Sequence, residues 1–425
     1  MKVEALHEIF LQNPSICTDT RKLAENDIFF ALKGENFNGN SYAQKAIENG
    51  AIYAVIDEEK FFIDHRTILV ENALQALHNL ANFHRHHCKA KIVALTGSNG
   101  KTTTKELINA VLSQSYKTIA TKGNLNNHIG VPLTLLSIKE NTEIAIVEMG
   151  ANHQKEIEFL STLTEPDFGY ITNFGKAHLE GFGGVEGVIK GKSELYTHLI
   201  AKNKGIFMNA DDPIQKEKLA LYINKYGYSS TDTTFSIIKM SGANPFVEIE
   251  VEKTHIRTRL IGSYNFPNCC AAILIGKYFN VDIGMIKLGL ESYIPDNNRS
   301  QVIEKKGRKI ILDAYNANPT SMKAALENFS QMQSDHKFLF LGDMFELGED
   351  AKEEHQNIAE LAQELGFKNT ILIGESFYET KNDFEKFKTF DDLKKYLDFE
   401  KITPKSTLLI KGSRGMALER ILEII

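Results

Sequence analysis

The residues best suited to chemistry lie in KIVALTGSNGKTTTKE, the segment Lys91–Glu106. An apolar stretch leads into a turn with Gly97 and Gly100, and Lys101 and three threonines follow. Backbone N–H groups in such a turn, with the positive end of the following helix, bind phosphate, while the lysine adds a positive charge and Thr102 can bind magnesium. The segment therefore predicts a site for a nucleoside triphosphate, most simply ATP.

The loop departs from the strict nucleotide-binding pattern. That pattern places a glycine five residues before Gly100, where this chain has Leu95, and the turn opens instead at Gly97. An ordinary surface turn is the alternative interpretation. The order of strand, two glycines, Lys-Thr and helix favours a shortened phosphate loop.

Three further side chains are candidates for the same site. Glu148 ends the apolar stretch EIAIVEMG, and the carboxyl ends of parallel strands form the ligand-binding edge of an open α/β sheet. It is a candidate magnesium ligand, with a surface strand-end carboxylate as the alternative. His178, in a glycine-rich loop, and Lys192, on the following helix, carry no assignment from spacing alone, because such residues are usually solvated.

Composition limits the class of protein. The 425 residues are 42% hydrophobic and 24% charged, with a formal net charge of -6, so the whole chain does not favour nucleic acid or an anionic membrane. No apolar run approaches about 18 residues, and we expect a cytoplasmic protein without membrane insertion. The four cysteines fit no zinc spacing and are expected to be reduced. The run HRHHC, residues 84–88, is interpreted as a solvated helix end and linker.

The order of expected elements predicts an α/β protein of three domains. Residues 1–88 mix short strands with two helical patterns, and residues 89–297 alternate strands and helices as a mostly parallel sheet requires. Within the second domain, residues 226–262 are interpreted as β-hairpins and residues 265–279 as a helix. Residues 298–425 contain four strands separated by helices, KIILDAYN, KFLFLGDM, NTILIG and STLLIKGS, a pattern typical of a Rossmann-like domain.

Several motifs in order resemble the Mur ligases of peptidoglycan synthesis, and within that family the branch that adds a dipeptide. They are TGSNGKTTTKE, NLNNHIGVPLTLL, EMGANH, NFGKAHLEGFG, KGKSE, LDAYNANPTSM, LGDMFELG and KGSRGM. The resemblance implies an N-terminal domain for a UDP-sugar, a central ATPase domain and a C-terminal domain that closes over the substrates. It also implies a monomer.

The resemblance assigns roles by position. The ATP-binding residues would be Gly97, Ser98, Asn99, Gly100, Lys101, Thr102, Thr103, Asn265, Asn268, Arg299 and Asp313. Two magnesium ions would be held by Thr102, Glu148, His178 and a carbamate formed on Lys192, with Lys101, Glu148, His178 and Lys192 as the catalytic set. Substrate contacts would come from Asp19, Thr20, Arg21, Asn38, Gly39, Asn126, Asn127, Tyr315, Asn316 and Asn318. The turn Lys411–Arg414 would add positive charge on closure.

The implied reaction is ATP-dependent joining of D-alanyl-D-alanine to a UDP-muramoyl-tripeptide through an acyl phosphate. A sister ligase that adds the third amino acid is one alternative, although the sequence ESFYETKND after NTILIG lacks the Asp-Asn-Pro-Arg motif of the diaminopimelate-adding branch. Folylpolyglutamate synthases are less similar, because their loop usually continues Gly-Lys-Gly-Ser. A non-catalytic ATP-binding regulator is the remaining alternative.

Overall fold

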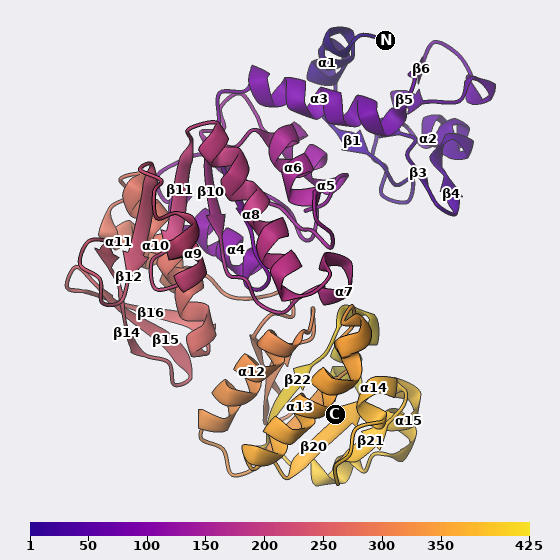
Figure 1. The fold of residues 1–425 in the computed structure, drawn as a ribbon. Coiled ribbons are helices and arrows are strands. Elements are labelled where there is room, and N and C mark those ends of the chain that lie inside the picture. Colours follow the sequence, from indigo (N-terminus) through magenta and orange to yellow (C-terminus); the bar gives the residue numbers. More distant parts are fainter.

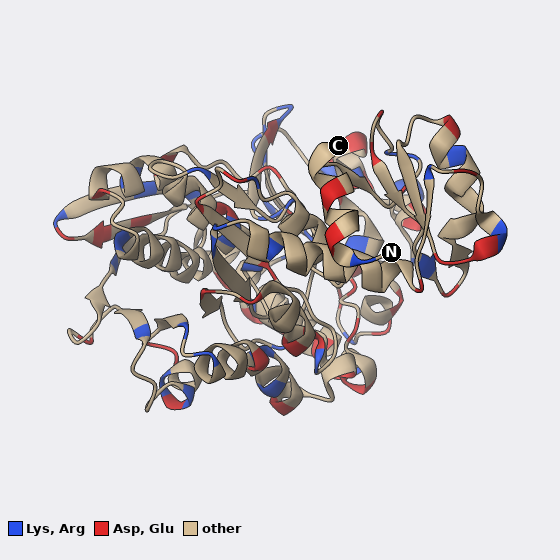
Figure 2. Ribbon diagram, turned by 90° about the horizontal axis from the view of Figure 1, so that it is seen from above, with Lys and Arg blue, Asp and Glu red and all other residues tan.

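The computed structural model describes residues 1–425 and contains three principal sheets that follow one another along the chain. Figure 1 shows each sheet with its own helices, and the C-terminal elements lie below the central ones in that view. None of the helices combines the length and the apolar character needed to cross a bilayer. In Figure 2 basic and acidic residues are interspersed over the visible elements.

The N-terminal sheet has four parallel strands in the order β1-β2-β5-β6. These strands are β1 (Ile16–Cys17), β2 (Ile28–Phe30), β5 (Tyr53–Ile56) and β6 (Thr67–Leu69). A short antiparallel pair joins β3 (Lys33–Gly34) to β4 (Phe37–Asn38). The helices are α1 (Val3–Gln12), η1 (Gly39–Tyr42), α2 (Ala43–Glu48), η2 (Glu59–Phe61) and α3 (Ala73–His87).

The interpretation of HRHHC as a solvated helix end is wrong for two of its residues. His84 and Cys88 are both buried. His84 lies on the side of α3 that contacts His7 and Ile138, and Cys88, directly after the helix, has its Sγ 3.4 Å from Nε2 of His84. A ring nitrogen of His84 lies 2.8 Å from the carbonyl oxygen of Ile138, and the other lies 3.0 Å from Nε2 of His7. Burial lowers the pKa of His84 below its usual value, so the neutral ring is favoured.

The central sheet has seven parallel strands in the order β13-β12-β11-β10-β7-β9-β8. They are β7 (Lys91–Thr96), β8 (Thr118–Ala120), β9 (Ile144–Glu148), β10 (Phe168–Ile171), β11 (Gly205–Asn209), β12 (Lys225–Ser229) and β13 (Ser236–Ile237). Alternate residues of β7 enter different cores, since Ile92 packs in one and Val93 in the other. This two-sided burial explains the continuous apolar sequence of β7.

Helices cover both faces of the central sheet. They are α4 (Lys101–Leu112), α5 (Gly130–Leu136), α6 (Glu156–Thr164), α7 (Leu179–Phe182), α8 (Val185–Ala201), α9 (Pro213–Lys218), α10 (Phe266–Tyr278) and α11 (Ile283–Ser292), with the short η3 (Ser263–Asn265) before α10. Cys269 and Cys270 are buried free thiols in α10, as expected. Pro267 lies in the first turn of α10, where proline leaves no helical hydrogen bond unmade.

The interpretation of residues 226–262 as hairpins is correct only for their second part. β14 (Lys239–Gly242), β15 (Phe246–Val251) and β16 (Thr254–Ile261) form an antiparallel sheet. β12 and β13 instead extend the parallel sheet, with β12 paired to β11. Short strands joined by polar turns have the same local pattern in both arrangements, so the pairing partner could not be predicted.

The C-terminal unit, from β17 to α16, has a sheet in the order β17-β18-β22-β19-β20-β21 with only β17 antiparallel. Its strands are β17 (Gln301–Lys305), β18 (Arg308–Asp313), β19 (Lys337–Gly342), β20 (Asn369–Ile373), β21 (Glu385–Phe387) and β22 (Thr407–Lys411). Its helices are α12 (Pro319–Gln331), η4 (Gly348–Asp350), α13 (Ala351–Glu364), α14 (Glu375–Tyr378), α15 (Phe390–Tyr396), η5 (Phe399–Lys401), η6 (Arg414–Met416), η7 (Leu418–Arg420) and α16 (Ile421–Ile424). The four predicted strands are confirmed.

Candidate active site

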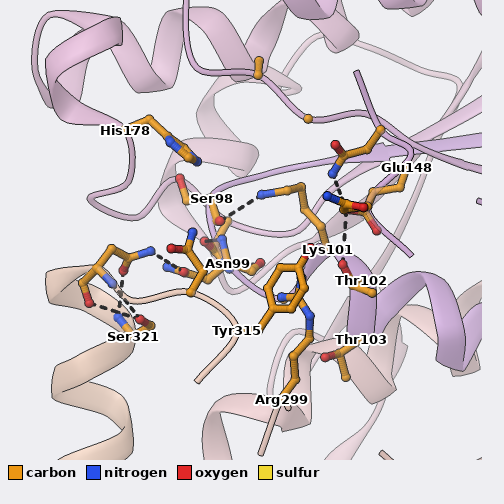
Figure 3. Close-up of a pocket in the computed structure, with 18 of the residues that line it drawn as sticks. Ser98, Asn99, Lys101, Thr102, Thr103, Glu148, His178, Arg299, Tyr315 and Ser321 are labelled. Carbon is orange, nitrogen blue, oxygen red and sulfur yellow. Dashed lines mark hydrogen bonds between the residues drawn. The ribbon is translucent and has the colours of Figure 1, made fainter. Parts of the chain in front are cut away.

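A cavity of about 870 Å³ lies between the carboxyl end of the central sheet and the facing edge of the C-terminal unit. The central unit contributes the turn after β7, the end of β9 and the loop after β10. The C-terminal unit contributes the ends of β18 and β22 and the start of α12. The cavity is thus enclosed by residues that are far apart in the sequence, and Figure 3 shows part of its lining.

The turn after β7 requires glycine at two positions. Gly97 has φ of 141°, and a Cβ there would lie 2.0 Å from Oγ1 of Thr172. Gly100 has φ of 77°, and a Cβ there would lie 2.5 Å from Oδ1 of Asn268. Both glycines therefore permit a positive φ and a close approach that a larger residue would prevent.

The backbone of Asn99 is fixed between these glycines. Its carbonyl oxygen accepts hydrogen bonds from Oγ1 of Thr172 at 2.6 Å and Nδ2 of Asn173 at 3.0 Å. Its N–H donates to Oδ1 of Asn173 at 3.1 Å. The loop after β10 therefore holds the turn in one conformation, and Asn173 was not predicted as a site residue.

Lys101 begins α4 and folds back over the turn (Figure 3). Its Nζ donates to the carbonyl oxygens of Gly97 at 2.7 Å and Ser98 at 3.0 Å. Burial lowers the pKa of Lys101 to about 8, although the carboxylate of Glu148 acts in the opposite direction. A bound anionic phosphate would favour the charged form of Lys101, because it would be a stronger hydrogen-bond acceptor for the ammonium than the two carbonyl oxygens.

Glu148 is buried at the end of β9, with 1% of its surface exposed. Its Oε1 accepts hydrogen bonds from Oγ1 of Thr102 at 3.2 Å and Nδ2 of Asn126 at 2.8 Å (Figure 3). Its Oε2 is buried without a hydrogen-bond partner. An unpaired buried carboxylate oxygen is costly, and a hard cation such as magnesium would satisfy it.

The residues present fit magnesium bound together with a phosphate. The structure brings no three His, Cys, Asp or Glu side chains together as a metal cluster. Magnesium commonly takes only one or two carboxylates and completes its shell with phosphate oxygens and water. Glu148 and Thr102 would therefore hold it from the protein side.

His178 and Lys192 occupy different positions relative to the cavity. His178 lines it, and its Nδ1 contacts Oε2 of Glu346 from the C-terminal unit, which keeps the pKa of that carboxyl below its usual value. Lys192 is fully buried and donates to the carbonyl oxygen of Ala151 at 2.9 Å. Ala151 lines the cavity whereas Lys192 does not, so the amine of Lys192 lies just outside the cavity, next to one of its lining residues.

Burial lowers the pKa of Lys192 well below its usual value, and the nearby charge of Lys101 lowers it further. The side chain also lies over the ring of Phe182, with Nζ 4.6 Å from the centroid. A neutral amine in this position is nucleophilic. This is the form that reaction with carbon dioxide requires.

The expected nucleotide residues from later in the chain all line the same cavity, namely Asn265, Asn268, Arg299 and Asp313. Asn268 supports the phosphate loop, because its Oδ1 accepts from Oγ1 of Thr104 at 3.0 Å and its Nδ2 donates to Asn265. The guanidinium of Arg299 lies 3.7 Å from the ring centroid of Tyr315. Lys411 forms an ion pair with Asp313 at the adjoining strand ends.

The C-terminal unit contacts the phosphate loop through Asn318. Its Oδ1 accepts from the N–H of Ser321 at 2.9 Å and caps α12, while its Nδ2 donates to Oδ1 of Asn99 at 2.7 Å. Close by, the N–H of Lys176 donates to Oγ1 of Thr320 at 3.0 Å, and Nζ of Lys176 pairs with Glu354 at 2.6 Å. Tyr315 and Asn316 line the cavity beside these contacts.

Asn126 and Asn127 also line the cavity, but both have partners within the protein. Asn126 donates to Glu148, as described above. Oδ1 of Asn127 accepts from the N–H groups of Ile129 at 3.1 Å and Gly130 at 2.9 Å. Asn126 therefore orients a carboxylate, a function that the sequence did not indicate.

The candidate residues of the N-terminal unit lie outside this cavity. Asp19 and Arg21 form a hydrogen-bonded ion pair with each other, and Thr20 lies between them. Asn38 accepts from the N–H of Asn40 at 3.0 Å and donates to Glu58 at 2.9 Å. The nearby Gly39 is tightly packed, since a Cβ would lie 2.4 Å from the carbonyl oxygen of Leu32.

Family models match three successive parts of the chain. They are "Mur ligase family, catalytic domain" over residues 15–85, "Mur ligase middle domain" over residues 95–276 and "Mur ligase, glutamate ligase domain" over residues 298–414. The chain belongs to the Mur ligase family.

Full-length relatives carry a more specific name. The UDP-N-acetylmuramoyl-tripeptide--D-alanyl-D-alanine ligase of Bacillus subtilis is 34% identical over 96% of this chain and 92% of its own length. The ligase of the same name from Escherichia coli is 32% identical over 97% and 93% of the two chains.

Solved structures agree with these relatives. A crystal structure of MurF from Acinetobacter baumannii superposes with a TM-score of 0.85 at 30% identity, covering 96% of this chain and 92% of the other. MurF ligase from Thermotoga maritima in complex with ADP gives a TM-score of 0.83 at 26% identity, covering 97% of each chain. The expected fold class is confirmed.

We predict that magnesium-free ATP binding weakens as pH rises above about 8, because Lys101 of the free protein loses its proton there, whereas bound phosphate keeps this lysine charged. Calorimetric titrations between about pH 7 and 9.5 would measure this change. Lys101→Met is expected to bind ATP weakly throughout and to lose most of the pH dependence. An unchanged pH profile in this variant would exclude Lys101 as the titrating group.

We also predict that Asn318→Ser lowers activity while leaving the melting temperature nearly unchanged. Serine can cap α12 but is too short to reach Asn99, whereas Asn318→Ala loses both contacts. Both variants are expected to lower kcat/KM by roughly 2- to 10-fold, the equivalent of one neutral hydrogen bond, and only Asn318→Ala to lower the melting temperature clearly. Wild-type kcat/KM in Asn318→Ser would contradict a role for the contact with Asn99.

Proposed function

We propose that this protein is an ADP-forming ligase that uses ATP to join D-alanyl-D-alanine to UDP-N-acetylmuramoyl-tripeptide. The observation that carries the proposal is the meeting, in one cavity, of a phosphate loop, a buried carboxylate with an unpaired oxygen and side chains of the C-terminal unit. The names of the full-length relatives support the choice of substrates. ATP use agrees with the ADP-bound structure of the Thermotoga relative.

The reaction begins at the carboxylate of the tripeptide. One of its oxygens attacks the γ-phosphorus of ATP, so that a new P–O bond forms and ADP leaves. The amine of D-alanyl-D-alanine then attacks the acyl carbon, the C–N bond forms and inorganic phosphate leaves. The amine loses a proton, and the product is a pentapeptide precursor.

The protein contributes mainly position and charge. Lys101 and the N–H groups of the turn bind the triphosphate, whose negative charge would otherwise repel the attacking carboxylate. Magnesium, when bound, offsets further negative charge on the phosphoryl group. The C-terminal unit excludes water from the acyl phosphate, whose hydrolysis would release phosphate without forming the peptide bond.

We assign the UDP-sugar to the N-terminal unit, within residues 1–88, the ATP site to residues 89–297 and closure to residues 298–425. Asp19, Thr20, Arg21, Asn38 and Gly39 lie outside the central cavity, as residues that hold the far end of an extended substrate would. The exposed guanidinium of Arg21 is suited to a diphosphate. We also place the reaction in the cytoplasm, where ATP is available.

We further propose that Lys192 carries a carbamate. Its Nζ would attack carbon dioxide, a N–C bond would form and one proton would be released, which replaces an amine with an anionic oxygen group. The low pKa and the burial of the amine support this step. The anion would offset the positive charge of Lys101, which lowers the pKa of Lys192 in the unmodified protein.

We predict that wild-type protein in ¹³C-bicarbonate gives a carbamate signal in NMR and that Lys192→Met does not. The variant is expected to lose most ligase activity, and excess bicarbonate is not expected to restore it. Lys190→Met, a change of an exposed lysine on the same helix, is the matched control. Absence of the wild-type signal would refute the carbamate, and wild-type turnover in Lys192→Met would refute its role in the reaction.

The proposed function predicts acceptor-dependent release of phosphate. Purified protein would be given ATP, magnesium and either UDP-N-acetylmuramoyl-tripeptide or UDP-N-acetylmuramoyl-dipeptide, with D-alanyl-D-alanine or single amino acids, and products would be identified by mass. We expect a UDP-muramoyl-pentapeptide only when the tripeptide precursor is combined with D-alanyl-D-alanine. Turnover of UDP-muramoyl-dipeptide with one amino acid would instead identify the sister branch, and ATP binding without turnover would identify a regulator.

A further inference from the structure

Lys105 is a buried lysine that the proposed reaction does not use. It lies on α4 one turn after Lys101, its surface is 0% exposed, and it does not line the cavity. Its Nζ donates to the carbonyl oxygen of Thr121 at 2.5 Å and pairs with Oε1 of Glu106 at 2.7 Å. Burial of an unpaired ammonium is costly, and an aliphatic side chain would fill the same space. The two contacts to Thr121 and Glu106 therefore offset the cost of burying this ammonium.

Thr121, the partner of Lys105, is connected to the strand that carries Glu148. It follows β8, and its N–H donates to the carbonyl oxygen of Ile146 at 3.0 Å. Its Oγ1 accepts from the N–H of Glu148 at 3.0 Å. Lys105 thus fixes, from the helix of the phosphate loop, a residue that hydrogen-bonds directly to the backbone of Glu148.

A loop follows Thr121 after β8 and ends beside the carboxyl end of β9. Residues 122–125 are exposed, and Gly123 has φ of 54° in open space, since a Cβ there would have no atom within 4 Å. The loop therefore has little packing of its own. At its end Asn126 donates to Oε1 of Glu148 at 2.8 Å, and its carbonyl oxygen accepts from the N–H of Gly150 at 2.7 Å. The loop is held at Thr121 on one side and Asn126 on the other.

We propose that Lys105 is a positioning residue for Glu148. By fixing Thr121 it fixes the loop that ends at Asn126, and together these residues keep one carboxylate oxygen occupied and leave Oε2 free for magnesium. The inference rests on the proposed function, since it assigns magnesium and ATP to this cavity. Lys105 itself touches neither.

The first test compares magnesium dependence in wild type and Lys105→Met, which keeps the length of the side chain but removes its charge and donors. We expect the magnesium concentration for half-maximal activity to rise about tenfold, and kcat at saturating magnesium to change much less. Removal of a buried cation by itself would strengthen cation binding. An unchanged or lower magnesium requirement would therefore overturn the proposal.

A second pair of variants tests the same connection in case Lys105→Met does not fold. Thr121→Val removes the hydroxyl that accepts from Glu148, whereas Thr121→Ser keeps it. Valine is expected to raise the magnesium requirement and serine to restore it. Thr258→Val, which removes a buried hydrogen bond to Val247 in the antiparallel sheet, should lower stability without changing the magnesium requirement.

Hydrogen exchange of the ligand-free protein gives a readout that does not depend on activity. The amides of Glu148 and Gly150 donate to Thr121 and Asn126, so we expect both to exchange faster in Lys105→Met and at the wild-type rate in Thr258→Val. Unchanged exchange would overturn the proposal even for an active enzyme. If both amides exchanged faster in Lys105→Met but the wild-type protein formed no pentapeptide, the positioning role of Lys105 would be supported and only the proposed function would be refuted.

Discussion

The site depends on the hydrogen bonds that hold Asn99. The loop after β10 fixes its backbone through Thr172 and Asn173, and α12 contacts its side chain through Asn318. These partners come from two units of the chain, and their bonds define the shape of a turn that has few apolar contacts of its own. Because the turn is already formed, phosphate binding does not require it to be ordered first.

The second constraint is the burial of ionisable groups. Glu148, Lys105 and Lys192 are all fully or almost fully buried, and each has a specific polar partner. Water is largely excluded around them, so the charges of bound ligands interact more strongly than they would at a surface. Catalysis of transfer between two anions depends on such fixed charges, and a protein of net charge -6 must provide the positive ones locally.

Sequence reasoning succeeded where local pattern determines structure. The order of strand, glycine turn and helix placed Lys101 and Thr102, and the apolar run of β9 placed Glu148 at a sheet edge. It did not predict that Asn126 binds Glu148 or that Lys105 anchors Thr121, because these contacts join segments that meet only in the folded chain. The same limit applies to β12, because the pattern of its own residues does not indicate that it pairs with β11.

The contacts that join His178 to Glu346 and Lys176 to Glu354 have a thermodynamic consequence for the whole enzyme. The ion pair of Lys176 with Glu354 is partly exposed. Such pairs contribute only about 0 to 1 kcal/mol each, so this one favours contact between the two units weakly, and ionic strength weakens it further. Ligands that touch both units must then supply much of the free energy that holds the units together. By reciprocity, the factor by which bound ATP favours contact between the two units equals the factor by which that contact tightens ATP binding.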